Sequence, residues 1–143
     1  MIFVDASAMV AIVSNEAGSD RLSDVLITDE TFVSSPLAMW EAVVSVRRKA
    51  IDAGRDLSAA DAHSFITATF ASLPLIIEPI TAEDGVVAID AFALYGRGMQ
   101  SPARLNMADC FHYAVASRLE AAILFISPNE FHHTDLPSAL ARP

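Results

Sequence analysis

The first seven residues, Met1 to Ser7, read M-I-F-V-D-A-S and decide how the rest of the chain is interpreted. Ile2, Phe3 and Val4 form an unbroken apolar run of β-branched and aromatic side chains, which predicts a strand buried on both faces of a parallel sheet. Asp5 directly follows this run. Because ligands bind outside the carboxyl ends of the strands in open α/β sheets, Asp5 is a candidate functional residue.

Asp5 also has a purely structural interpretation. Residues Ala6 to Val13 read as a short apolar helix, and aspartate is one of the favoured residues at a helix N-cap. Asp5 could therefore be a helix cap or a functional residue, and only its relation to other acids in the chain can distinguish these two roles.

Length and composition limit the classes of protein to which the chain can belong. Its 143 residues suit a single domain, 1–143, with a sizeable core. The apolar fraction is 53% and the mean hydropathy is +0.41, yet no apolar run approaches the roughly 20 residues of a membrane helix. We therefore expect no membrane association. The high apolar content instead predicts an interface with a second subunit or another partner.

Charge and cysteine content limit the possible binding partners and the cellular compartment of the protein. The net charge of −9, from nine basic and eighteen acidic residues, argues against a broad basic surface for nucleic acid. It leaves room for an acidic metal site with a few local arginines. The single cysteine, Cys110, and the absence of a basic leader before the first apolar run predict a cytoplasmic protein.

Apolar strands and amphipathic helices alternate along the chain. The predicted strands cover residues 2–4, 31–33, 75–77 and 122–126, and the predicted helices cover residues 6–13, 16–28, 35–54, 58–72, 81–95 and 106–120. This alternation predicts an α/β fold with a parallel sheet, right-handed crossovers and helices on both faces.

Three further acids have positions that deserve comparison with Asp5. Glu41 has apolar neighbours on nearly every side of its helix, so we interpret it as a functional acid, with pairing to Ser45 or Arg48 as the alternative. Asp109 follows Asn106 by three residues, which suits helix capping and equally suits an ionised metal ligand.

Glu130 is the third of these acids and follows the last apolar strand through a turn. Its default interpretation is a solvated loop acid. If all four carboxylates converge, a cation must neutralise them, and an oxygen-only set suits Mg²⁺ or Mn²⁺. Such ions polarise phosphates and activate water, so the predicted reaction is phosphodiester hydrolysis.

Several motifs, in register along nearly the whole chain, carry a family resemblance. They are V-D-A-S-A at 4–8, the acid within the helix at 40–45, Y-G-R-G at 95–98, L-N-M-A-D-C-F at 105–111 and L-F-I-S-P-N-E-F-H-H-T-D-L at 124–136. Together they resemble VapC-type PIN-domain ribonucleases, the toxins of type II toxin–antitoxin systems. The resemblance implies a PIN-like three-layer α/β/α fold with a central parallel sheet.

The resemblance also implies specific roles. Asp5, Glu41 and Asp109 take the positions of the family's metal-binding acids, and Ser7 takes that of the small polar residue beside the first acid. Family members use Mg²⁺ or Mn²⁺ to cut RNA, usually form homodimers and are inhibited by a cognate antitoxin. The chain is therefore expected to be a metal-dependent endoribonuclease.

Departures from the family pattern concentrate near the last motif. Glu130 stands where relatives often have aspartate, and Ser127-Pro128 replaces a common Lys-Gly pair. Arg97 and Arg104 match positions that are commonly basic, which implies contacts to RNA phosphates, with a solvated loop as the alternative.

His112 and Cys110 lie beside Asp109 in the sequence. We interpret His112, three residues beyond Asp109 on the same helix face, as a packed histidine, with a place at the site rim as the alternative. Cys110 is assigned to the core, and Trp40 and Phe111 to the core or an interface.

Two other functions compete with the nuclease. The first is a PIN-like binding protein whose acidic groove engages a basic peptide, which the net charge favours. The second is a phosphorylated or nucleophilic Asp5, which is weakened because Lys49 is the only lysine and no second acid lies two residues after Asp5.

Overall fold

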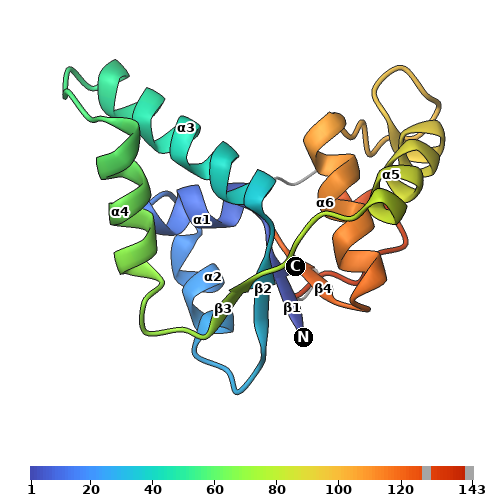
Figure 1. Ribbon diagram of the computed structural model, residues 1–143, viewed down its shortest axis with the longest axis horizontal. Coiled ribbons are helices and arrows are strands. Elements are labelled where there is room, and N and C mark those ends of the chain that lie inside the picture. Colours follow the sequence, from blue (N-terminus) through green and yellow to red (C-terminus); the bar gives the residue numbers. More distant parts are fainter. Residues whose placement is uncertain (127–129, 141–143) are drawn as a thin grey trace.

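The computed structural model describes residues 1–126 and 130–140 and shows a parallel sheet between two groups of helices (Figure 1). The four strands run in the spatial order β3-β2-β1-β4, and all neighbours pair in parallel. Their bounds are β1 Ile2–Val4, β2 Phe32–Ser34, β3 Leu75–Ile77 and β4 Ala122–Leu124. The predicted α/β class and parallel sheet are confirmed.

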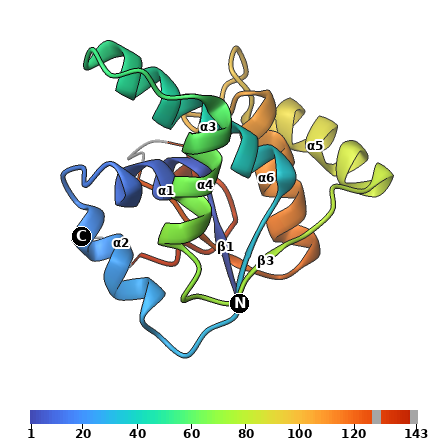
Figure 2. The same cartoon turned by 60° about the vertical axis from the view of Figure 1, so that its left-hand side comes forward.

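Helices cover both faces of this sheet. Helices α1 to α4 lie together on one side, and α5 and α6 pack against each other on the opposite side, as the two views in Figures 1 and 2 agree. The bounds are α1 Ala6–Val13, α2 Ser19–Leu26, α3 Pro36–Asp52, α4 Ala59–Thr69, α5 Ala82–Tyr95 and α6 Met107–Arg118, followed by the short 3₁₀ helix η1 Phe131–His133. The α/β/α layering expected from the resemblance is present.

Side-chain caps fix where most helices begin. The hydroxyls of Ser35 and Ser58 each accept a backbone N–H three residues on, and Thr81 and Asn106 each form a reciprocal capping box with the aspartate at the third helical position. These caps satisfy backbone donors that have no partner within the helix. The predicted starts of α3 to α6 are accurate for this reason.

Five predicted elements had boundaries that were wrong by two or more residues. The second helix begins at Ser19 rather than residue 16, because Gly18 adopts a left-handed φ of 89° that cannot continue a helix, and it ends at Leu26. Helix α4 ends at Thr69 rather than near residue 72, and Phe70 turns inward as its buried C-cap. Strand β4 ends at Leu124 rather than residue 126, and α3 and α6 each end two residues before their predicted ends.

The position of β1 in the sheet places the first acid centrally. Phe3 and Val4 are 0% exposed, whereas Ile76 and Ile77 on the edge strand β3 are 48% and 43% exposed. With the N-terminus at the bottom of Figure 1, the strands run upward, so their carboxyl ends meet where α1, α3 and α6 begin. Within the described ranges, no helix combines the length and apolarity needed to cross a membrane.

Candidate active site

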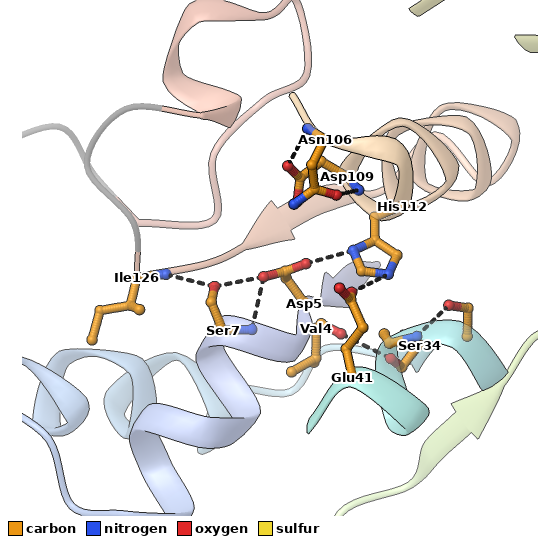
Figure 3. Close-up of polar contacts among 11 residues, drawn as sticks. Val4, Asp5, Ser7, Ser34, Glu41, Asn106, Asp109, His112 and Ile126 are labelled. Atoms are coloured by element: carbon orange, nitrogen blue, oxygen red, sulfur yellow. Dashed lines mark hydrogen bonds and ion pairs between the residues drawn. The ribbon is translucent and has the colours of Figure 1, made fainter. Parts of the chain in front are cut away.

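The four acids that the sequence singles out line one crevice at the carboxyl end of the sheet. Asp5 comes from the end of β1, Glu41 from α3, Asp109 from the start of α6 and Glu130 from the residue before η1. The crevice has a volume of about 300 Å³. Figure 3 shows Asp5 and Glu41 facing the same histidine, with Asp109 above them. The chain fold therefore brings together carboxylates that are up to 125 residues apart.

Asp5 is buried and fully engaged in hydrogen bonds. Its Oδ2 accepts the backbone N–H of Ser7 at 2.8 Å and the Ser7 hydroxyl at 2.5 Å, while Oδ1 lies 2.7 Å from Nδ1 of His112. Burial alone would raise the pKa of Asp5, but the hydrogen bond and charge of His112, with the two bonds from Ser7, hold that pKa below its ordinary value. Asp5 thus caps α1 and also belongs to the crevice.

Ser7 connects the first acid to the end of β4. Besides donating to Asp5, its hydroxyl accepts the backbone N–H of Ile126 at 3.3 Å. This bond ties the residue after Phe125 to the start of α1. Ser7 therefore fixes the Asp5 carboxylate relative to two strands at once.

His112 is the residue whose place at the site the sequence left open. Its side chain is completely buried between two acids, with Nδ1 at Asp5 and Nε2 3.4 Å from Oε2 of Glu41 (Figure 3). Burial alone would lower the pKa of His112, but the hydrogen bond to Asp5 and the charges of Asp5, Glu41 and Asp109 raise it. The helical spacing of three residues from Asp109 was the available signal, since it puts both side chains on one face of α6.

Asp109 also caps a helix, as the third helical residue of α6 behind the N-cap Asn106, but its pKa shifts in the opposite direction from that of Asp5. Its Oδ2 accepts the backbone N–H of Asn106 at 2.7 Å, and the Asn106 side chain accepts the N–H of Asp109 in return. Burial raises the pKa of Asp109 to about 7, and the nearby charges of Glu130 and Asp5 add to this rise. In the absence of a cation, this carboxyl group therefore holds its proton close to neutral pH.

Glu41 and Glu130 complete the acidic lining. Burial raises the pKa of Glu41, and the charges of Asp5 and Glu130 act in the same direction while His112 opposes them. Glu41 faces His112 rather than forming the helical pair with Ser45 or Arg48 that we considered. Ser127 and Pro128, where the sequence departs from the family pattern, lie outside the described residues.

The donor chemistry of the crevice suits a divalent cation. Carboxylate oxygens are the ligands that Mg²⁺ and Mn²⁺ prefer. Burial raises the pKa values of Glu41 and Asp109, and the charges of neighbouring acids add to this rise. In the described part of the chain, no three acidic, histidine or cysteine side chains converge closely enough to hold an ion as they lie. Binding would therefore draw the carboxylates inward.

The two arginines expected to contact substrate lie elsewhere. Arg97 lines a separate apolar cavity of about 500 Å³ between α5 and α6, and its Nε donates to the backbone carbonyl of Arg104 at 3.3 Å. Neither arginine lines the acidic crevice, which instead contains Arg48 and Lys49 from α3. Sequence spacing could have identified Arg48, because it follows Glu41 by seven residues, which is two helical turns.

Cys110 and Trp40 have contrasting positions. Cys110 is buried as a free thiol, as expected. Trp40 is 61% exposed on α3 and does not belong to the core, and its predicted place at an interface stays a prediction. Phe111 is partly buried and packs against the core.

The fold and the acidic crevice together define a class of protein. The molecule is an α/β/α domain whose acidic crevice is built from the end of β1 and from the helices α1, α3 and α6. The family model described as "PIN domain" matches residues 2–135. The chain belongs to the PIN domain family, and the resemblance seen in the sequence motifs is confirmed.

Curated relatives match over almost their whole length. The chain is 35% identical over 145 residues to the VapC ribonuclease R02377 of Rhizobium meliloti, covering 95% of this chain and 99% of that protein. It is 33% identical over 138 residues to ribonuclease VapC42 of Mycobacterium tuberculosis, covering 96% and 98%.

Two solved structures share the fold. The Mycobacterium tuberculosis protein VapC20, titled a sarcin–ricin loop cleaving toxin, aligns with a TM-score of 0.67 at 15% identity over 90% of this chain and 91% of that one. A toxin–antitoxin complex from Klebsiella pneumoniae aligns with a TM-score of 0.65 at 12% identity over 94% and 93%.

Proposed function

We propose that this protein is a metal-dependent endoribonuclease and the toxin of a toxin–antitoxin pair. The observation that carries the proposal is the convergence of Asp5, Glu41, Asp109 and Glu130 in one crevice. Relatives at 33–35% identity that span the same length are named VapC ribonucleases. Together, the site chemistry and the family favour phosphodiester hydrolysis over a binding role alone.

Asp5, Asp109 and Glu41 would hold Mg²⁺ or Mn²⁺, and Glu130 would complete the acidic wall. The bound ion would supply a polarised phosphate and an activated water. Ser7 keeps the Asp5 carboxylate in one orientation through its two hydrogen bonds. Asp109 would give up its proton on metal binding, because its pKa of about 7 reflects burial and the neighbouring acids rather than a bond that favours the neutral form.

Arg48 and Lys49 support a path for the RNA backbone. Four of the nine basic residues in the chain lie within nine residues of sequence, Arg47, Arg48, Lys49 and Arg55. Arg48 and Lys49 line the acidic crevice itself, so an RNA phosphate held beside the carboxylates would also meet a positive charge. Ser7, Arg97 and Arg104 remain proposed substrate contacts, the two arginines only for RNA that extends toward α5.

Exposed apolar residues support two protein partners, a second copy of the chain and an antitoxin. On α5 and at the start of α6, beside the 500 Å³ cavity, the exposed large apolar side chains are Val86, Val87, Ile89, Phe92, Leu94 and Met107. A second apolar cavity lies between α3 and α4, lined in part by Met39 and Phe70. Two separate apolar surfaces suit two different partners.

RNA cleavage by antitoxin-free protein tests the proposed function. A panel of tRNA and rRNA should be cut with Mg²⁺ or Mn²⁺ and left intact with EDTA. Asp5→Asn should abolish this cleavage, whereas Asp90→Asn, which changes an exposed acid on α5, should retain it. Cleavage that survives both EDTA and Asp5→Asn would overturn the proposal, and metal binding without cleavage of any RNA would favour the binding-protein alternative.

A further inference from the structure

A further cavity lies directly beside the acidic crevice. It has a volume of about 550 Å³ and is lined by residues at the end of α1, in the C-terminal half of α3, in the turn that follows α3 and on α4. These three helices lie together on one side of the sheet (Figures 1 and 2), and we call the space between them the α1–α3–α4 cavity. Glu16 and Lys49 line both this cavity and the crevice, so the two spaces share a wall.

An ion pair forms this shared wall. Nζ of Lys49 on α3 lies 2.8 Å from Oε1 of Glu16, which follows the end of α1. That oxygen is shielded from solvent, and the charge of Lys49 offsets the cost of burying it. Because an α-helix rises about 1.5 Å per residue, Lys49 lies about 12 Å along α3 from Glu41. Neighbouring nucleotides of one extended RNA strand can therefore contact both positions.

The α1–α3–α4 cavity combines an aromatic wall with balanced charges. Phe65 on α4 lines it and is 52% exposed, and Val13 and Leu57 add apolar lining. Its charged lining residues are two basic and two acidic ones, namely Lys49, Arg55, Glu16 and Asp56. This lining suits a neutral, flat, aromatic molecule with hydrogen-bond donors and acceptors at its edge. An unstacked nucleobase has these properties.

Mixed polarity distinguishes this cavity from the two apolar ones. The α5–α6 cavity and the α3–α4 cavity near β3 are lined mainly by apolar side chains. A partner helix that binds in a groove buries an apolar face, so those two cavities suit a protein partner better. The α1–α3–α4 cavity instead continues the crevice in which the carboxylates lie.

Unpaired basic side chains lie on both sides of Lys49. Arg48 lines the crevice and Arg55 lines the α1–α3–α4 cavity. Neither arginine forms an ion pair in the described part of the chain. In a chain with a net charge of −9, such a pair of free cations favours contact with a polyanion. These charges and the aromatic wall together favour a nucleotide of bound RNA as the occupant.

We propose that the α1–α3–α4 cavity binds the base of a nucleotide next to the scissile phosphate, stacked on Phe65, while Lys49 contacts the phosphate between the two spaces. The inference rests on the proposed ribonuclease function and adds the contact that selects where the RNA is cut. The substrate must be single-stranded at this nucleotide, because a paired base is held in the stack. Arg55 and Asp56 offer a donor and an acceptor to the edge of the base.

A pair of variants on one helix tests the base contact in cleavage. Phe65→Ala removes the exposed aromatic ring, and His63→Ala is the matched control, because His63 lines the α3–α4 cavity near β3 instead. Once a cut site is mapped, each nucleotide that flanks the cut is replaced in turn by an abasic one. At one position this replacement should lower kcat/KM about tenfold for the wild type and His63→Ala. Phe65→Ala should lose about as much on the intact RNA and show no further loss on the abasic RNA.

Photocrosslinking detects the same contact without cleavage. Short single-stranded RNAs that carry thiouridine or thioguanosine are irradiated with the Asp5→Asn protein, and mass spectrometry locates the attached residue. We expect adducts at Phe65 or at its neighbours in the α1–α3–α4 cavity. Adding Phe65→Ala to this protein should reduce their yield, whereas adding His63→Ala should not.

The outcomes separate this inference from the proposed function. Metal-dependent cleavage with an unchanged rate and an unchanged abasic effect in Phe65→Ala would overturn the base site and leave the nuclease standing. Adducts in the cavity without cleavage of any RNA would retain it as an RNA-binding site and overturn the nuclease. If Phe65→Ala instead weakens inhibition by the cognate antitoxin and leaves cleavage and adducts unchanged, the cavity belongs to the protein partner and the base site is overturned.

Discussion

Asp5 and Asp109 both help to cap the start of a helix, but their pKa values shift in opposite directions. Each is a buried aspartate at the start of a helix, and each accepts a backbone N–H two or three residues away. The pKa of Asp5 is nevertheless held below its ordinary value, while burial raises that of Asp109 to about 7. Helix capping alone therefore does not set the charge of a buried carboxyl group.

The difference lies in what each carboxylate meets across the crevice. Asp5 receives the Nδ1–H of His112 and the hydroxyl of Ser7, which offset its loss of solvation. Asp109 receives one backbone N–H and faces the charges of Glu130 and Asp5. Asp5 is thus held in its ionised form, whereas Asp109 would be ionised only by the cation of the proposed function.

The largest effect is expected from substitutions that remove the carboxylate of Asp5 or of Asp109. Asp5→Asn and Asp109→Asn should each lower RNA cleavage by more than about 100-fold, because even residues that only support metal ligands contribute about 10- to 100-fold. Cleavage rates measured under saturating Mn²⁺ test this, with Asp90→Asn as the exposed-acid control. Retention of near-normal cleavage by Asp109→Asn would show that the site functions without the Asp109 carboxylate.

The same two substitutions should have opposite effects on stability. Asp5→Asn replaces a charge-assisted bond to His112 and should lower the free energy of unfolding by about 1–2 kcal/mol. Asp109→Asn keeps an acceptor for the Asn106 N–H and removes repulsion, so it should raise that free energy in metal-free protein at about pH 8.

Urea denaturation of both variants and the wild type measures these free energies. The contrast should shrink at about pH 5, where Asp109 is already protonated. If both variants are destabilised to the same extent at both pH values, the two aspartates do not differ in the way described here.

The free energy of unfolding of the metal-free protein should depend on pH in a way that reports the protonation of Asp109. Asp109 has a pKa of about 7 when folded and 3.8 when unfolded, so the folded state binds more protons between these values. The free energy of unfolding must then fall as pH rises from about 4 to 7. His112 acts in the same direction, since its raised pKa gives stability below 6.5 that is lost as pH rises through its folded pKa.

Thermal melting of metal-free and Mn²⁺-loaded protein tests this linkage. Mn²⁺ should raise the melting temperature more at about pH 8 than at about pH 5.5, because it displaces the Asp109 proton. Carboxyl chemical shifts in NMR report the pKa of Asp109 itself. An Asp109 pKa near 4 in the metal-free protein would contradict the electrostatic difference between Asp5 and Asp109.

The smallest effect is expected from substitution of the basic residues that line the crevice, Arg48 and Lys49. Arg48→Ala should weaken RNA binding several-fold and reduce its salt dependence by about one phosphate contact, because Arg48 lines the crevice. Arg97→Ala is the comparison variant and should have a smaller effect on a short RNA, since Arg97 lies at the α5–α6 cavity. Fluorescence anisotropy with an uncleavable RNA and the inactive Asp5→Asn protein measures both. A larger loss for Arg97→Ala would place the RNA path over α5 instead.

Local patterns were sufficient for most of the fold. The apolar runs located all four strands within two residues at each end, and the serine, threonine and asparagine caps located the starts of α3 to α6. These features depend on neighbours within one helical turn or one strand. Errors arose where a backbone conformation decided the boundary, as at Gly18, and at the end of α4, where the buried Phe70 is the C-cap.

For the candidate site too, some features could be predicted from local sequence patterns and others could not. By itself, the sequence determined the family, through motifs in register along the chain, and it predicted the four acids from their places after strands, at a helix start or among apolar helical neighbours. Only the tertiary structure decided that His112 lies between Asp5 and Glu41, that Arg48 rather than Arg97 lines the crevice, and that two capping aspartates have opposite pKa shifts. Burial and the charges that meet across a crevice depend on residues up to 125 positions apart, and no local pattern encodes them.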